Sequence, residues 1–214
     1  ILCGSEFVRK GIGQCGGPAD KAVVIPYVSA LNVECRMERK EAGNPLRVLF
    51  MGTVSLRKGV PYLLEAARLL KGRAAFRVVG PLAVTESAER ELRRWVDVRG
   101  PVPRSEVQSH YEWADVFLLP SLCEGSALVC YEAMAAGLPV VCTPHTGSVV
   151  RDGVDGFLVP VRDPQAIAVR LEELAGQSER RMAMSMNACE RATMFALRAY
   201  GDRLIAAIEG KKKE

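Results

Sequence analysis

The stretch of residues 116–143 constrains the fold more than any other. Residues 116–120 form a short apolar run that ends in a proline, and residues 140–143 form a second, β-branched run. The residues from about 126 to 136 are rich in helix formers, and the Gly-Leu-Pro that follows them is typical of a helix end. The pattern predicts a strand, a loop, a helix and a second, parallel strand.

The loop of this unit predicts an anion site. It lies where the carboxyl end of a strand meets a helix amino end, the usual ligand position in open α/β sheets. We expect the amides of four consecutive residues to face an anion there, namely Gly125, Ser126, Ala127 and Leu128.

Two carboxylates flank the predicted anion site. Glu124 lies in the loop, and Glu132 follows eight residues later, about two helical turns on, near the same face. Carboxylates accept hydrogen bonds from hydroxyl groups but do not bind phosphate. The pattern therefore favours a ligand with hydroxyls, then phosphate, then hydroxyls, which is the layout of a nucleotide sugar.

Glu124, seven further residues, Glu132 and then Ala-Met-Ala-Ala-Gly-Leu-Pro-Val-Val resemble a known signature. It is that of retaining glycosyltransferases with the GT-B fold, and the chain is most similar to family 4, the group 1 enzymes, over residues 47–174. The resemblance implies that Glu124 contacts the donor sugar and that Glu132 binds the nucleotide ribose. The alternative is a surface glutamate and a helix glutamate in an ordinary βαβ unit.

A second strand–loop–helix unit is predicted over residues 46–70, with its loop at residues 52–59. The family pattern in this loop is Gly-Arg, with a lysine five residues after that arginine. Here Gly52 is present, Thr53 stands in the arginine place and Lys58 in the lysine place. The resemblance implies that Lys58 binds the diphosphate and, with Glu124, carries the catalysis. Arg57 either supplies the missing charge or is a solvated loop residue.

A third strand is predicted at residues 75–79, ending at Gly80, followed by a helix at 83–96 and a short strand at 95–98. The resemblance implies that backbone groups of the next loop, including Arg99, Gly100 and Val102, meet the nucleotide base. Ser105 is expected to cap the next helix. Backbone recognition leaves little residue signature, so the base, the sugar and the acceptor stay open.

The remaining segments set the expected domain organisation. Gly147 is expected to allow close backbone approach to the ligand. His145 is a further candidate for a residue that lies near the site. A helix should begin after Asp163, and one or two closing helices should span residues 182–208. Residues 1–45 read as a strand, a Ser5-capped short helix, a glycine-rich loop, a strand at 21–26 and a polar stretch from residue 32.

Residues 1–45 resemble the segment that closes the N-terminal acceptor domain of the family. We therefore expect residues 1–45 to be a remnant of that domain and its linker, with nearly all of the domain missing. Residues 46–175 would be the nucleotide-sugar donor-binding domain, and residues 176–214 closing helices with a basic, disordered tail. The fold class is α/β, a doubly wound parallel sheet forming the C-terminal half of a GT-B fold. The alternative is a complete domain with an irregular first unit.

Composition excludes several classes of function. A net charge of +4 and only 6% aromatic residues argue against a nucleic-acid partner. The seven cysteines include no Cys-x-x-Cys pair and there are two histidines, so no metal site is predicted. The sequence has a single Gly-x-Gly-x-x-Gly, at residues 11–16 in the glycine-rich, loop-like stretch, and it lacks a phosphate-binding Gly-Lys-Ser/Thr, so no cofactor is expected. It also lacks an apolar run long enough to span a membrane. Reduced thiols and a cytoplasmic location are expected, with peripheral membrane association possible.

The sequence thus predicts transfer of a sugar from a nucleotide diphosphate sugar to an acceptor, a saccharide, lipid or small molecule, with retention of configuration. One alternative is a nucleotide-sugar binding or assembly module that has lost catalysis, with Thr53 as the relevant departure. Others are a sugar phosphorylase or sugar-phosphate synthase on the same fold, or a protein-interaction domain without nucleotide affinity.

Overall fold

The computed structural model describes residues 1–28 and 45–210. Within these residues a six-stranded parallel sheet has the order β5-β4-β3-β6-β7-β8. The predicted doubly wound parallel sheet is confirmed. Its strands are β3 (Leu46–Met51), β4 (Ala74–Val79), β5 (Asp97–Gly100), β6 (Val116–Leu119), β7 (Val140–Cys142) and β8 (Gly156–Leu158).

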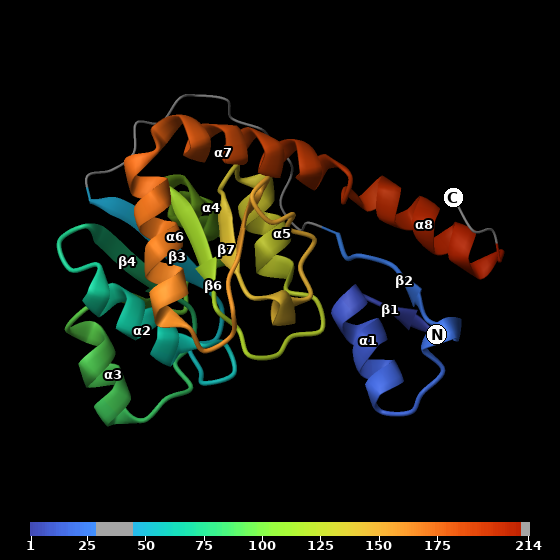
Figure 1. Ribbon diagram of the computed structural model, residues 1–214, viewed down its shortest axis with the longest axis horizontal. Coiled ribbons are helices and arrows are strands. Elements are labelled where there is room, and N and C mark those ends of the chain that lie inside the picture. The colour runs from blue at the N-terminus through green and yellow to red at the C-terminus, as the bar shows by residue number, and fades with distance from the viewer. Residues whose placement is uncertain (29–44, 211–214) are drawn as a thin grey trace.

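Helices cover both faces of the sheet. Figure 1 shows α2 and α6 together in front of the sheet and α4 behind it, while α7 runs across one end. None of the described helices is long and apolar enough to cross a membrane. The helices are α2 (Val60–Leu69), α3 (Glu86–Arg93), α4 (Arg104–Trp113), α5 (Leu128–Ala135), α6 (Pro164–Gly176), α7 (Ser178–Thr193) and α8 (Leu197–Ile208).

The central strands are buried on both faces, as their unbroken apolar runs predict. All of β6 and β7 is buried, and so are four consecutive residues of β3 from Val48. The amino ends of β3 and β6 are joined by a two-pronged ion pair, in which the Arg47 guanidinium contacts Asp115 at 2.7 and 3.0 Å. This pair fixes the alignment of the two strands that flank the centre of the sheet.

Several predicted boundaries need correction. The helix expected at residues 83–96 spans only Glu86–Arg93, and the next strand begins at Asp97 rather than at Trp95. Ser105 does not cap α4, which begins at Arg104 after Pro103 without a side-chain cap. The strand β8 was not predicted. Asp163 does cap α6, since its Oδ1 accepts from the Ala166 amide at 2.8 Å.

Residues 1–28 form a small N-terminal unit beside the main sheet (Figure 1). It contains β1 (Leu2–Cys3), α1 (Glu6–Gln14), a 3₁₀ turn η1 (Ala19–Lys21) and β2 (Val23–Val24), with β1 and β2 parallel. Ser5 caps α1 as predicted, since its Oγ accepts from the Val8 amide at 3.3 Å. The predictions for the polar stretch from residue 32 and for the basic tail fall almost wholly outside the described residues.

The cysteines follow the expectation in part. Five of them are free thiols, and of these Cys3, Cys130 and Cys142 are buried. Cys189 is disulfide-bonded, so the expectation of reduced thiols fails at that position.

Candidate functional site

The order of the strands creates one switch point, between β3 and β6. From β3 the chain moves outward through β4 to β5, and from β6 it moves the other way through β7 to β8. The loops that follow β3 and β6 therefore leave two neighbouring strands at the same end of the sheet and run in opposite directions. Such a crevice is the usual ligand position in open α/β sheets.

Gly59 brings these two loops into contact. It directly precedes α2 and has φ +75°, and a Cβ at this position would lie 1.8 Å from the carbonyl oxygen of Pro120, just after β6. Only glycine permits this approach. The amino end of α2 is thereby held against the carboxyl end of β6, and Lys58 is placed beside the second loop.

Glu124 is the meeting point of the predicted charged residues. Its Oε1 lies 2.9 Å from Lys58 Nζ and 2.9 Å from an Arg57 guanidinium nitrogen. Lys58 and Glu124 are mostly buried, with 12% and 11% of their side chains exposed, whereas Arg57 is 57% exposed. Arg57 also donates to the Cys123 carbonyl at 3.1 Å. The structure thus brings Lys58 and Glu124 together and places the guanidinium of the exposed Arg57 against Glu124.

The predicted row of amides is only partly available. The amide of Ala127 donates to the Thr146 carbonyl at 3.0 Å, so Ala127 does not face an anion as expected. Correspondingly, α5 begins at Leu128, two residues later than expected. The amides of Gly125, Ser126 and Leu128 have no acceptor among the described residues.

Glu132 lies on α5 and contacts a different element from Glu124. Its Oε2 accepts from the Tyr111 hydroxyl of α4 at 3.0 Å. Burial raises the pKa of Glu132, while the Tyr111 hydrogen bond and the charge of Arg104 act in the opposite direction. Because α5 begins at Leu128, Glu132 stands about one turn into the helix instead of two.

The other predicted binding residues lie at the carboxyl ends of β3, β4 and β5. Gly52 donates its amide to Val79 O at 2.9 Å, and Gly80 donates to Gly100 O at 2.8 Å, so the three strand ends are bonded in series. The Arg99 side chain pairs with Asp97 at 2.9 Å. Thr53, which follows Gly52, and Val102, which follows β5, are both half-buried.

The sequence did not predict most of the contacts made by the loop after β6, which carries Glu124. His145 O accepts from the Glu124 amide at 2.9 Å, and the His145 ring packs on Phe7 of α1 with centroids 4.9 Å apart. A Cβ on Gly147 (φ +58°) would lie 2.4 Å from Gly125 O. Gly147 therefore permits close approach of its own neighbouring loop, which differs from the predicted approach to a ligand.

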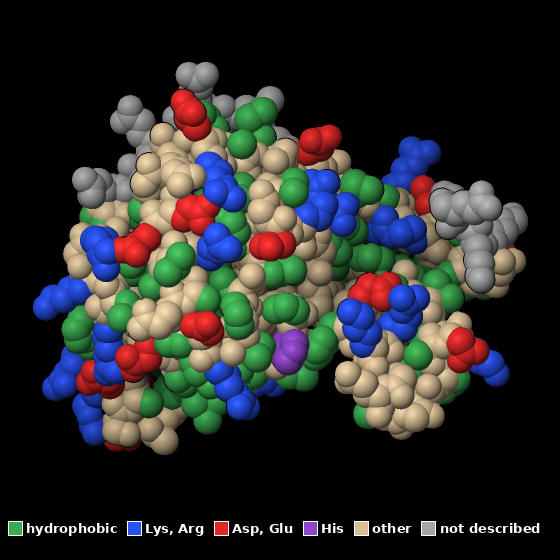
Figure 2. Space-filling view, in the orientation of Figure 1, with side chains coloured by type: hydrophobic (Ala, Val, Ile, Leu, Met, Phe, Trp, Pro, Cys, Tyr) green, Lys and Arg blue, Asp and Glu red, His purple; other side chains and the backbone are tan. Residues whose placement is uncertain are grey.

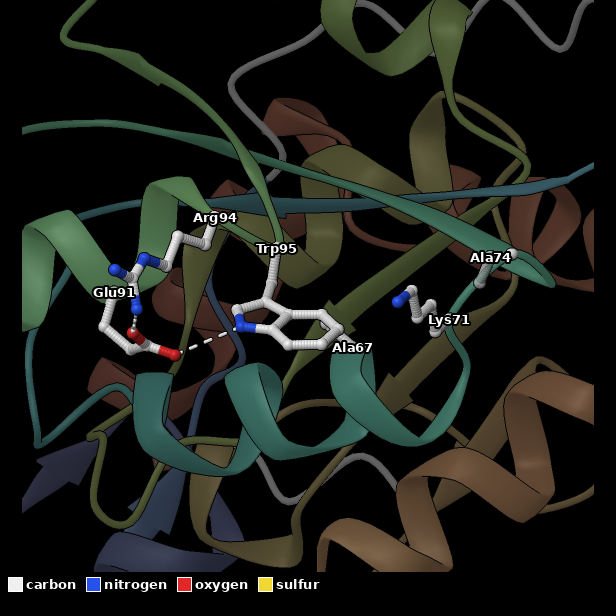
Figure 3. A pocket seen from close by; sticks show the side chains of 7 residues that line it. Ala67, Lys71, Ala74, Glu91, Arg94 and Trp95 are labelled. Carbon is white, nitrogen blue, oxygen red and sulfur yellow. Dashed lines mark hydrogen bonds and ion pairs between the residues drawn. The ribbon is translucent and has the colours of Figure 1, made fainter.

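A hollow lies near the amino ends of the strands, at the end of the sheet opposite the candidate site. It is lined by Lys71, Glu91, Arg94 and Trp95, near the start of β4 at Ala74 (Figure 3). Its polar groups are paired among themselves, since Glu91 accepts from Trp95 Nε1 at 3.1 Å and from Arg94 at 3.0 Å. Because ligands of open parallel sheets bind at the carboxyl ends of strands, we assign no function to this hollow.

The molecular surface mixes charges of both signs. Figure 2 shows lysines and arginines interspersed with acidic side chains, with no single basic patch on the face that is visible. In residues 1–28 and 45–210, no three His, Cys, Asp or Glu side chains are grouped so that they could hold a metal ion.

Sequence comparison identifies the family. The Glycosyl transferases group 1 family matches residues 45–177. The putative colanic acid biosynthesis glycosyltransferase WcaL of Salmonella typhimurium is 37% identical over 152 residues, which is 64% of this chain and 37% of WcaL. A D-inositol 3-phosphate glycosyltransferase of Geodermatophilus obscurus is 33% identical over 236 residues, covering 98% of this chain and 52% of that protein. The chain thus spans between about a third and a half of these relatives.

Solved structures share the fold at lower identity. HepE from Anabaena, in complex with UDP-glucose, superimposes with a TM-score of 0.80 at 19% identity, covering 98% of this chain and 63% of HepE. Sucrose-phosphate synthase from Thermosynechococcus elongatus gives a TM-score of 0.78 at 22% identity, covering 98% of this chain and 57% of that one. The parallel sheet is the Rossmann-like sheet of GT-B glycosyltransferases, and the chain belongs to the Glycosyl transferases group 1 family.

Proposed function

We propose that this chain is the donor-binding portion of a retaining glycosyltransferase that takes its sugar from a nucleotide diphosphate sugar. One observation carries the proposal: Lys58 and Arg57 from the loop after β3 converge on Glu124 from the loop after β6, at the switch point of the sheet. Cations and a carboxylate are what a diphosphate joined to a sugar requires.

Each group has a defined part in the proposed reaction. The bond between the anomeric carbon and the diphosphate oxygen breaks, a bond from that carbon to the acceptor oxygen forms, and the acceptor hydroxyl gives its proton to the departing diphosphate. Negative charge then develops on the departing diphosphate. Lys58, Arg57 and the amides of Gly125 and Ser126 would stabilise that charge electrostatically. Glu124, released from the cations, would accept hydrogen bonds from the sugar, and Glu132 from the ribose.

The relatives support the class of donor. HepE was solved with UDP and with UDP-glucose, and the curated relatives are named glycosyltransferases. UDP is therefore the first nucleotide to test. Because the chain covers 37% of WcaL, we propose that the acceptor is bound mainly by an N-terminal domain outside this sequence. Retention of configuration rests on the resemblance of the Glu124–Glu132 signature.

Calorimetric titration without added metal tests the donor site. The chain is titrated with UDP, GDP and ADP and with their glucose and mannose conjugates. We expect one nucleotide to bind selectively, and Lys58→Ala and Glu132→Ala to weaken it about tenfold or more. Lys71→Ala is the matched control, because Lys71 lines the hollow at the opposite sheet edge. Failure of both this chain and the full-length protein to bind any of the ligands would refute the proposal.

Thr53 favours a second candidate, a nucleotide-sugar binding module without turnover. The family's arginine is replaced there, so one diphosphate cation of the family pattern is absent. The full-length protein separates the two functions. Transfer or slow donor hydrolysis that Glu124→Gln abolishes supports the enzyme, whereas donor binding without either reaction supports the binding module.

A further inference from the structure

We propose that Tyr111 is a positioning residue that holds the Glu132 carboxylate with one oxygen directed at the ribose hydroxyls of the donor. The inference rests on the proposed function, because it takes Glu132 to be the ribose ligand. Nothing in the sequence pattern singles out Tyr111.

The contact joins two helices behind the sheet. Tyr111 lies in the last turn of α4 and Glu132 in the middle of α5, and the hydroxyl donates to Oε2 across 3.0 Å. Tyr111 is 1% exposed, and its ring packs on Phe117 of β6 with centroids 6.1 Å apart. A donor on a side chain packed this tightly is fixed in place, whereas a glutamate alone has three rotatable bonds.

The hydrogen bond leaves the other carboxylate oxygen available. Oε2 of Glu132 is taken by Tyr111, and Oε1 has no hydrogen-bond partner among the described residues. An ionised carboxylate only accepts hydrogen bonds, and the neighbouring 2′ and 3′ hydroxyls of a ribose are donors. The half-buried carboxylate thus has one anchored oxygen and one oxygen for a ligand.

The electrostatics agree with this geometry. Burial raises the pKa of Glu132, which opposes the ionised form that a ribose ligand needs. The Tyr111 hydroxyl and the positive charge of Arg104, also on α4, lower that pKa again. Burial and the nearby Glu132 charge raise the pKa of Tyr111 well above its ordinary value, so its proton stays available for donation.

A double comparison tests the inference. The affinities of wild type and Tyr111→Phe are measured for the nucleoside diphosphate selected by the titration above and for its 2′,3′-dideoxy analogue. Tyr111→Phe keeps the ring and its packing, so the fold should persist. We expect about fivefold weaker binding of the natural nucleotide and unchanged binding of the dideoxy analogue. Tyr62→Phe is the control, because Tyr62 also packs against the core and its hydroxyl has no partner among the described residues.

The outcomes separate this inference from the proposed function. Equal wild-type affinity for both nucleotides would remove Glu132 as the ribose ligand and would overturn this inference, while the donor site at Lys58 and Glu124 would stand. Wild-type discrimination that Tyr111→Phe leaves intact would overturn the role of Tyr111 alone. Carboxyl-carbon NMR gives a reading without ligand: Tyr111→Phe should raise the pKa of Glu132, and an unchanged pKa would contradict the hydrogen bond's role.

Discussion

At the scale of single residues, both cations of the loop after β3 are paired with one carboxylate oxygen, Oε1 of Glu124. On the proposed function, a diphosphate would compete with Glu124 for Lys58 and Arg57. Glu124 would offset this competition only when a sugar is present to donate hydrogen bonds to it. Glu124 would thereby disfavour a bare nucleoside diphosphate relative to the complete donor.

Replacing Glu124 should separate these two effects. We expect Glu124→Gln to bind UDP about fivefold more tightly, since about 1 kcal/mol of ion pairing no longer opposes the phosphate. Any preference for UDP-glucose over UDP should disappear, because the carboxylate that accepts the sugar hydroxyls is lost. Calorimetric titration of both ligands measures both effects.

The matched control for this substitution is Glu86→Gln, which removes a carboxylate from the exposed face of α3 without touching the site. Its affinities should equal those of the wild type. If Glu124→Gln binds UDP no better than the wild type does, then Lys58 and Arg57 are not the cations that hold the diphosphate.

Residue types predicted some partners and missed others. Lys58 and Glu124 follow two separate strands, and their convergence was predictable because parallel strands end at one edge. The Tyr111–Glu132 contact was not predictable, since a tyrosine in an amphipathic helix is usually interpreted as a core residue. The pairing of both cations with Glu124 was missed too, because the resemblance assigns each residue to the ligand.

At the scale of elements, apolar runs located the strands, while local chemistry misplaced several helix ends. The helix expected from Ser126 starts at Leu128 because Ala127 bonds instead to Thr146 in a neighbouring loop. The strand expected at Trp95 starts at Asp97, since the Trp95 amide still bonds to Leu92 O at the end of α3. The first of these boundaries depends on a partner distant in sequence, and the second depends on a local turn that extends the end of α3.

The close approach of Gly59 to Pro120 allows a quantitative test of how α2 is held against the end of β6. Gly59→Ala would place a Cβ 1.8 Å from Pro120 O, so α2 and the end of β6 must separate. We expect a loss of more than about 3 kcal/mol in the free energy of unfolding, measured with urea. Gly72→Ala is the control, because Gly72 has φ +76° and open space around its Cβ position. Its loss should stay near 1 kcal/mol, the cost of a left-handed conformation alone. Similar losses for both variants would mean that the two loops are not held together at Gly59.

At the scale of the whole molecule, the N-terminal unit is bonded to the candidate site. The Ser5 hydroxyl donates to the Gly125 carbonyl, and Phe7 packs on His145, whose carbonyl holds the Glu124 amide. The sequence predicted the unit's helix and its cap but not its docking partner, because a docking contact leaves no periodic pattern. Its position means that the loop at residues 124–126 is shared by the unit and by the proposed diphosphate site.

This shared loop predicts that ligand binding and docking of the unit are linked. A diphosphate bound at the Gly125 and Ser126 amides would fix the loop on which α1 rests, and linkage of this kind is reciprocal. We expect UDP to slow amide hydrogen exchange in residues 6–14, as measured by mass spectrometry. Ser5→Ala should abolish that protection and should weaken UDP binding by about the factor by which UDP strengthens docking.

The control for this experiment is Ser87→Ala, a hydroxyl removal on the exposed start of α3, far along the chain from both loops. It should keep the protection of residues 6–14 that UDP gives the wild type. Unequal effects on exchange and affinity would point to a change confined to the unit. If UDP protects α1 in Ser5→Ala as fully as in the wild type, the Ser5–Gly125 contact does not transmit binding to the N-terminal unit.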